Sequence, residues 1–216
     1  MNELLREIKV LIWDFDGTLY KQIPALLDNI RDTEIQVIVK HTGWSEKKAK
    51  EEFYKIYGVT TPSGTTAVSQ IAHIPHDQSS RETSALTNYK KFLHSEPRLS
   101  QLFESLSMYR HFMLVNGSQE SVSQGLALIN LDKNIFEEII TSEIVGETKP
   151  SKKGFEYIMK KTGLPAAAHI MIGDREAVDL APAKMLGMKT CLVWSDSASL
   201  VADVTLKTVY EVATIL

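Results

Sequence analysis

Three apolar stretches of this chain end abruptly at polar residues, and this pattern restricts the fold more than any other feature. Residues 8–13 stop at Asp14, residues 111–115 stop at Asn116, and residues 170–172 lead through Gly173 to Asp174. Short uninterrupted apolar runs are typical of strands buried on both faces of a parallel sheet. Because ligands bind at the carboxyl ends of the strands in open α/β sheets, we expect these polar residues to converge.

The segments between and after these runs show the spacing of amphipathic helices. Such helices are predicted for residues 98–107, 118–129, 151–162, 176–186 and 208–216, and further short strands for residues 138–141 and 190–194. Strands that alternate with helices predict an α/β fold, with a parallel sheet covered by helices on both faces.

Residues 21–94 break this alternation and contain no convincing strand. A helix is predicted up to Thr42, where Gly43 ends it, and a second one over residues 46–57 with Ser45 as its cap. A weaker helix, a loop around residues 74–77 and a helix over residues 84–94 follow. We interpret 21–94 as a small helical domain inserted into a core made of residues 1–20 and 95–216.

Composition excludes several classes of protein. A length of 216 residues suits one domain with a smaller insertion. The net charge is −3 and no block of Lys and Arg occurs, which argues against binding a nucleic-acid polymer. No apolar run approaches the roughly 18 residues of a membrane span, and the N-terminus lacks the charge pattern of a signal peptide. We therefore expect a cytoplasmic protein with no membrane partner; its oligomeric state is not indicated.

Asp14 and Asp16 are the first residues that suggest chemistry. Carboxylates at i and i+2 of an extended chain lie on the same side, and their repulsion is relieved by a cation. Mg²⁺ prefers carboxylate oxygens together with substrate phosphate. One carboxylate can then attack phosphorus, and the other can protonate the leaving alcohol and later activate water. The alternative interpretation is an ordinary turn at Asp16-Gly17.

Further residues with suitable chemistry lie at two other predicted strand ends, on the helix after Asp174 and before Pro150. Asp174 would supply a second carboxylate to the metal, and Asp179 would orient its waters or a lysine. Lys149, fixed by the following proline, would neutralise an aspartyl-phosphate. Asn116-Gly117 would present N–H groups to a phosphate. Each has an ordinary alternative, namely acids at a helix N-terminus, a surface lysine and a turn.

The order and spacing of these segments resemble the haloacid dehalogenase (HAD) superfamily across nearly the whole chain. The matching motifs are residues 14–18, Lys149-Pro150, and Gly173-Asp174 with Asp179. The resemblance implies a Rossmann-like core with an inserted helical cap. It implies that Asp14 is nucleophile and Mg²⁺ ligand, and that Asp16 is acid/base and binds Mg²⁺ through its backbone carbonyl. Asp174 would be the third ligand and Lys149 the phosphoryl clamp.

The predicted function is that of a Mg²⁺-dependent phosphatase acting on a small phosphorylated metabolite through an aspartyl-phosphate. Nucleoside monophosphates, sugar phosphates and small phosphorylated acids all remain open, and residues 16–21 and the Tyr57-Gly58 region are similar to pyrimidine 5′-nucleotidase-like members. One alternative is a phosphomutase of the same family. Another is a weakly active phosphate-binding or interaction module, because Val115 or Asn116 stands where the family has Ser or Thr.

Two further segments suggest weaker hypotheses. His73, His76 and Asp77 hint at a metal site, but without more ligands at suitable spacing an ordinary loop is favoured. Tyr20 and Lys21 are interpreted as the first hinge into the insertion, with contact to substrate as an open alternative.

Overall fold

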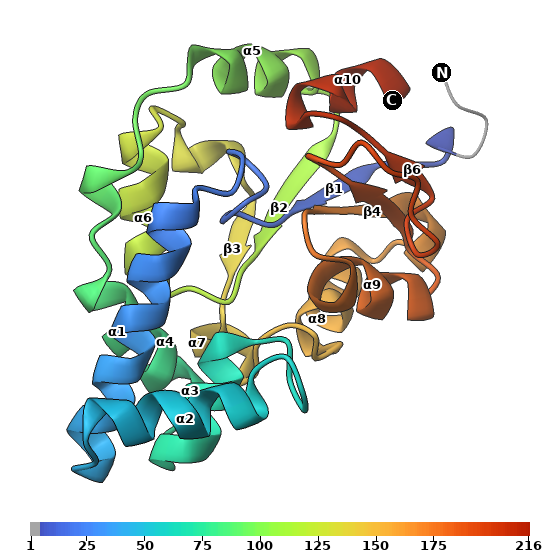
Figure 1. The fold of residues 1–216 in the computed structure, drawn as a ribbon. Coiled ribbons are helices and arrows are strands. Elements are labelled where there is room, and N and C mark those ends of the chain that lie inside the picture. The colour runs from blue at the N-terminus through green and yellow to red at the C-terminus, as the bar shows by residue number, and fades with distance from the viewer. Residues whose placement is uncertain (1–4) are drawn as a thin grey trace.

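The computed structural model describes residues 5–216 and shows a six-stranded parallel sheet in the order β3-β2-β1-β4-β5-β6 (Figure 1). The strands are β1 (Val10–Trp13), β2 (Arg110–Leu114), β3 (Glu138–Ile140), β4 (His169–Gly173), β5 (Lys189–Leu192) and β6 (Val204–Thr205). Helices pack on both faces, so the predicted Rossmann-like α/β class is confirmed.

Alternate residues of the central strand supply two separate cores. Leu11 and Trp13 face one side of the sheet, and Val10 and Ile12 face the other. The first core also receives side chains from α5 (Pro97–Ser105), α6 (Gln119–Leu128) and α10 (Val212–Ile215). The second receives them from α8 (Lys153–Thr162) and α9 (Ala181–Met185). Burial on both faces explains why β1 is continuously apolar.

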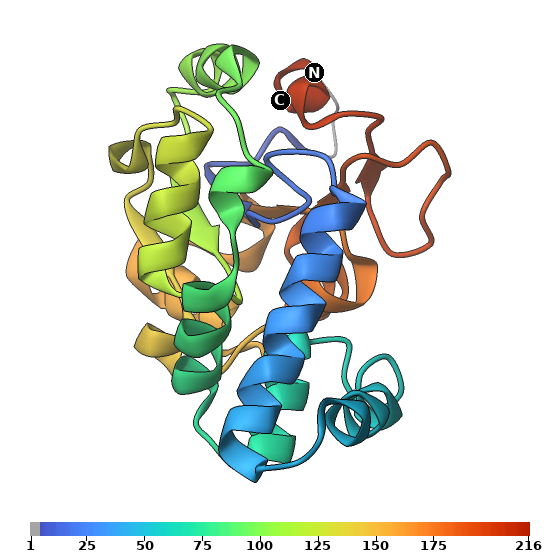
Figure 2. The same ribbon diagram turned by 60° about the vertical axis from the view of Figure 1, so that its left-hand side comes forward.

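The first four helices after β1 gather at one end of the molecule in both views (Figures 1 and 2). They are α1 (Pro24–Thr42), α2 (Glu46–Ile56), α3 (Gly64–Ala72) and α4 (His76–Leu86). They enclose a third apolar cluster built around Ile38, Phe53 and Val68. Ser45 caps α2 by accepting a hydrogen bond from the Lys48 N–H, and Gly43 ends α1 with a φ of 69°.

The helix predicted for residues 84–94 is misplaced. The chain is already helical from His76, where a loop was expected, and α4 ends at Leu86 before a short 3₁₀ turn, η2 (Tyr89–Lys91). The buried face of α4 consists of Ser79, Ser80 and Thr83. Since these side chains are hydroxyls rather than hydrocarbons, the helix has no apolar periodicity to detect.

The remaining differences concern short elements. The predicted helix over residues 176–186 is a π-helical turn, η5 (Glu176–Leu180), followed by α9. The predicted C-terminal helix is a 3₁₀ turn, η6 (Val209–Glu211), followed by α10. Sequence reasoning missed β6 and α7 (Ser142–Val145), and did not resolve the 3₁₀ turns η3 (Lys133–Ile135) and η4 (Ala166–Ala168). Elements of two to five residues carry too little periodicity to predict.

The order of the strands indicates where in the sheet a ligand site is expected. From β1 the chain proceeds to β2 and β3 on one side, and then to β4, β5 and β6 on the other. The reversal lies between β1 and β4, which pair through Val10–Trp13 and residues 169–172. A crevice at the carboxyl ends of the strands at such a switch point is the usual ligand site of open α/β sheets.

Candidate active site

Asp14 lies immediately after β1 at this switch point and is 3 % exposed. Its backbone N–H donates to the Ile172 carbonyl at 3.0 Å, which extends the pairing of β1 with β4 by one residue. The Thr18 hydroxyl donates to Asp14 Oδ2 at 3.1 Å. The carboxylate is therefore held by the strand and by the turn that follows it.

Lys149 joins two of the carboxylates. Its Nζ lies 2.7 Å from Asp14 Oδ1 and 2.7 Å from Asp179 Oδ1, and the side chain is 1 % exposed. Burial disfavours the charged form, but Asp14 and Asp179 outweigh it and raise the pKa of Lys149 above its ordinary value. A buried ammonium between two carboxylates is thus kept charged beside Asp14.

Asp174, which follows β4, is the carboxylate without a counter-charge at close range. Its Oδ1 is buried and has no hydrogen-bond partner among residues 5–216, and the Arg175 Nε lies 3.9 Å away. Burial, together with Asp14 and Asp179, raises the pKa of Asp174 to about 7. A buried acceptor with no partner is rare, and here a cation would satisfy it.

The residues present fit a hard divalent cation. Asp14, Asp174 and Asp179 each offer an oxygen, and these atoms lie within 4.8 Å of one another. Oxygen ligands of this kind are those that Mg²⁺ takes. Gly17 keeps the space open, because its φ is +84° and a Cβ there would lie 2.4 Å from Asp174 Oδ2. The side chain of Asp16 lies outside this cluster.

Asp16 instead faces the neighbouring cavity and is bound by two tyrosines. The hydroxyl of Tyr20 donates to Oδ1, and that of Tyr89 donates to Oδ2 at 3.5 Å. Burial and the charge of Asp14 raise the pKa of Asp16 to about 6, against the opposing effect of the Tyr20 hydrogen bond. A carboxyl group with a pKa near neutrality suits a general acid.

Both polar atoms of the Asn116 side chain form hydrogen bonds with the backbone of Lys149. Its Oδ1 accepts from the Lys149 N–H at 2.8 Å, and its Nδ2 donates to the Lys149 carbonyl at 2.9 Å. The same Nδ2 also donates to Ser63 Oγ at 3.3 Å. The amide that was predicted to face phosphate therefore holds Lys149 in place in this structure.

The motif-two position has no hydroxyl toward the cavity. The Val115 side chain is 4 % exposed and belongs to the apolar cluster that includes Trp13. Gly117 lines the cavity beside Asn116. Asn116 and Gly117 thus border the cavity in front of the carboxylates, whereas Val115 does not.

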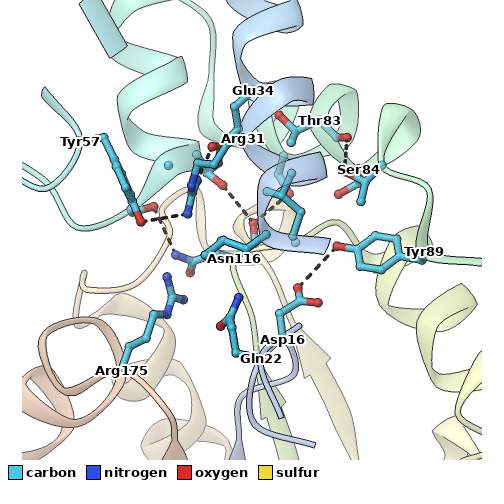
Figure 3. A pocket seen from close by; sticks show the side chains of 18 residues that line it. Asp16, Gln22, Arg31, Glu34, Tyr57, Thr83, Ser84, Tyr89, Asn116 and Arg175 are labelled. Carbon is cyan, nitrogen blue, oxygen red and sulfur yellow. Dashed lines mark hydrogen bonds and ion pairs between the residues drawn. The ribbon is translucent and has the colours of Figure 1, made fainter. Parts of the chain in front are cut away.

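A cavity of about 170 Å³ lies between the sheet edge and the helical insertion. Figure 3 shows Asp16, Gln22 and Arg175 on one side of it, and Arg31, Glu34 and Thr83 on the opposite side. Sequence reasoning identified Asp16, Asn116 and Gly117 as site residues and noted Tyr57 only through the nucleotidase-like resemblance, but it missed the other lining residues. Arg31 and Glu34 stand at i and i+3 of α1, and nothing in that spacing distinguishes a buried pair from a solvated one.

Residues 73–77, which hinted at a metal site in the sequence, lie outside the candidate site. His73 ends α3 in the left-handed conformation, and Asp77 pairs with Arg81 at 2.5 Å on α4. Neither they nor His76 line the cavity. Within residues 5–216, no helix has the length and apolar character to cross a membrane.

The fold and the site define an α/β protein with a carboxylate-rich centre at the switch point of its parallel sheet. The family model described as haloacid dehalogenase-like hydrolase matches residues 11–193, and the chain belongs to this family. The predicted family and the prediction of an enzyme are thereby confirmed.

Curated relatives of this chain are phosphatases, and a solved structure shares its fold. A glyceraldehyde 3-phosphate phosphatase of Pyrococcus abyssi is 28 % identical over 199 residues, which cover 87 % of this chain and 81 % of the relative. A relative of the same description from Pyrococcus furiosus is 24 % identical over 88 % of this chain and 81 % of its own length. The HAD phosphatase from Thermococcus onnurineus superimposes with a TM-score of 0.67 at 22 % identity, over 96 % of this chain and 97 % of that one.

Proposed function

We propose that this protein is a Mg²⁺-dependent phosphatase that hydrolyses a small phosphomonoester through an aspartyl-phosphate on Asp14. The observation that carries the proposal is the contact of the Lys149 ammonium with Asp14 Oδ1 at 2.7 Å, with the Asp16 carboxyl bordering the adjacent cavity. A nucleophile, a fixed counter-charge and a proton donor then surround one position for phosphorus.

Asp14, Asp16 and Lys149 have distinct roles in the proposed reaction. An Asp14 oxygen attacks phosphorus, and the bond from phosphorus to the leaving oxygen breaks while Asp16 gives that oxygen its proton. Asp16 then takes a proton from water, whose oxygen attacks phosphorus and releases Asp14. Lys149, positioned by Asn116, stabilises the negative charge throughout.

The proposed metal ligands are Asp14, Asp174 and the main-chain carbonyl of Asp16, with Asp179 outside the ligand set and paired with Lys149. Bound Mg²⁺ would neutralise the carboxylates and the phosphate oxygens. The partnerless Oδ1 of Asp174 supports this assignment. The proposed phosphate contacts are Lys149 and the segment Asn116-Gly117.

The proposed substrate is a phosphate ester of about three carbons. The relatives reported above are described as acting on glyceraldehyde 3-phosphate. A cavity of about 170 Å³ also lies below the roughly 300–1,000 Å³ of typical drug-sized ligand sites, which favours a triose-sized ester over a nucleotide. The nucleotidase-like resemblance of residues 16–21 has no support from these relatives.

We also propose that residues 21–94 form a cap domain on a core of residues 1–20 and 95–216. The separate apolar cluster around Phe53 supports this division. The cytoplasmic location expected from the sequence is part of the same proposal.

Phosphate release from a panel of phosphomonoesters, with and without Mg²⁺, tests the function beside the variant Asp14→Asn. Asn keeps the shape but is a poor nucleophile, so kcat should fall at least about 10³-fold. Turnover that survives in Asp14→Asn would contradict the aspartyl-phosphate. A folded wild type that binds Mg²⁺ but releases no phosphate would favour the binding module, and transfer to a second hydroxyl of a sugar phosphate would favour the mutase.

A further inference from the structure

The side of the cavity opposite the carboxylates carries a closed ion pair. Arg31 Nη1 donates to Glu34 Oε2, and Arg31 Nη2 donates to the Tyr57 hydroxyl at 2.9 Å. The guanidinium also lies 4.2 Å from the centre of the Tyr57 ring. Glu34 is 3 % exposed and the Arg31 side chain is 16 % exposed, so the carboxylate is shielded from water and the guanidinium is partly shielded.

Gly64 fixes this pair against the backbone. A Cβ at Gly64 would lie 1.9 Å from Glu34 Oε1 and 2.4 Å from Arg31 Nη1. The first residue of α3 therefore packs directly against the pair and leaves it little freedom to separate. The pair presents polar atoms to the cavity without a net charge.

The rest of this wall consists of hydroxyls, and one of them is unsatisfied. The lining residues of this kind are Ser63, Thr65, Ser80, Thr83, Ser84 and Thr87. Thr83 is 8 % exposed, and its Oγ1 finds no hydrogen-bond partner within the described part of the chain. Buried hydroxyls are seldom left unpaired, so a group that occupies the cavity is expected to complete this one.

Arg175, the other cation that lines the cavity, lies on the side of the carboxylates. Its Nε lies 3.9 Å from Asp174 Oδ1. Its charge therefore belongs to the carboxylate cluster of the core. A second anionic group on the substrate would find no uncommitted cation on the wall opposite that cluster, because the charge of Arg31 is already paired with Glu34.

We infer that this cavity selects an uncharged, hydroxylated leaving group, with Thr83 as a hydrogen-bonding contact and the Arg31–Glu34 pair as the element that excludes a carboxylate. The inference rests on the proposed phosphatase function and specifies its substrate class. It assigns a specificity role to three side chains of the insertion, at the opposite end of the substrate from Asp14.

Three esters of equal chain length test the inference: glycerol 3-phosphate, 3-phosphoglycerate and n-propyl phosphate. Wild type should hydrolyse glycerol 3-phosphate with a kcat/KM at least about tenfold above those of the other two, because a site built for hydroxyls rejects both the charged and the apolar analogue. Equal or better use of 3-phosphoglycerate would overturn the inference and make Arg175 an anchor for carboxylate.

Thr83→Val and Glu34→Gln separate the two contributions. Thr83→Val should lower kcat/KM for glycerol 3-phosphate about threefold to tenfold and leave n-propyl phosphate unchanged, since only one hydrogen bond is lost. Glu34→Gln frees the charge of Arg31 and should raise the ratio of 3-phosphoglycerate to glycerol 3-phosphate at least about fivefold. Equal losses on all esters would show a structural role only and overturn the inference.

Two control variants and one binding measurement complete the test. Thr33→Val removes a buried hydroxyl that is bonded to Ile30 and Thr87, and Glu82→Gln removes an acid outside the cavity. Neither should change the ratios. Calorimetric binding of the three esters to Asp14→Asn with Mg²⁺ gives the same ranking without turnover. No turnover of any ester or of an aryl phosphate would reject the phosphatase, whereas turnover without this ranking would reject only the inference.

Discussion

At the scale of single residues, position 115 shows how one side chain can be read wrongly from a motif. The family motif suggests that a hydroxyl is missing there, as if Val115 were a damaged phosphate contact. In the structure Val115 packs into the core, and its own N–H pairs with the Ile140 carbonyl at 3.0 Å. The neighbouring residue, Asn116, contacts Lys149 instead.

Replacing Val115 by Thr should therefore not increase activity. The hydroxyl would be buried among apolar side chains without a partner, which costs about 1–3 kcal/mol of unfolding free energy. Urea unfolding and the kcat for an aryl phosphate measure the two effects. Val10→Thr, an equally buried valine of β1, is the matched control and should lose similar stability. A kcat above wild type for Val115→Thr would show that position 115 faces the substrate.

At the scale of elements, α1 and α4 are joined by an ion-pair cluster on the insertion. Glu82 of α4 accepts from Lys40 at 2.9 Å and contacts His41 at 2.8 Å, both on α1. Burial alone would raise its pKa, but hydrogen bonds from Gln78, Lys40 and His41 lower the pKa of Glu82 to about 2. The cluster therefore favours the packed arrangement of the two helices when Glu82 is ionised.

This cluster predicts a pH-dependent stability. A carboxyl whose folded pKa is about 2 and whose unfolded pKa is about 4.5 contributes fully above the latter, and its contribution is lost as pH falls toward 2. Wild type should lose more unfolding free energy between pH 6 and pH 3 than Glu82→Gln. Urea midpoints at the two pH values measure this. Glu51→Gln, on an exposed face of α2, should behave as wild type; a loss in Glu82→Gln equal to that of wild type would contradict the prediction.

At the scale of the whole molecule, the active site is a centre of unbalanced negative charge that opposes folding. Asp174 is buried beside Asp14 and Asp179, and its raised pKa means that ionisation costs stability as pH rises from about 3.8 to about 7. At pH 8 the full penalty is present. A bound cation would convert this penalty into a stabilising contribution.

Asp174→Asn should accordingly be at least as stable as wild type at pH 8 in a chelator. Addition of Mg²⁺ should raise the Tm of wild type by several degrees and that of Asp174→Asn by much less, because only the former has the ligand. Asp179→Asn is the contrasting variant, since it removes a partner of buried Lys149 and should lower the Tm. If wild type and Asp174→Asn gained equally from Mg²⁺, this carboxylate would not be a ligand.

Local pattern was sufficient to predict five of the six strands and to propose most of the reactive side chains. Apolar runs with abrupt polar ends reveal buried parallel strands, and the topology of an α/β sheet brings such ends together whatever their separation in sequence. This is why Asp14 and Asp174 could be chosen without coordinates, whereas Lys149 and Asp179 were chosen because they match the motifs of the family. The same reasoning failed for α4, because its buried face is made of hydroxyls that bond to backbone, as Ser79 does to Thr65 and Ser80 to Asn116.

The sequence by itself determined the family and the class of sheet, and it predicted the set of reactive side chains, since these depend on local periodicity and on short motifs. Only the tertiary structure decided that Asn116 positions Lys149, that Val115 is core, and that Arg31, Glu34 and Thr83 form one wall of the cavity. These outcomes depend on how the helices of the insertion rotate and pack, and close contacts such as that of Gly64 with the ion pair set this packing. No local pattern records such contacts, because they join residues from different elements at distances of a few ångströms.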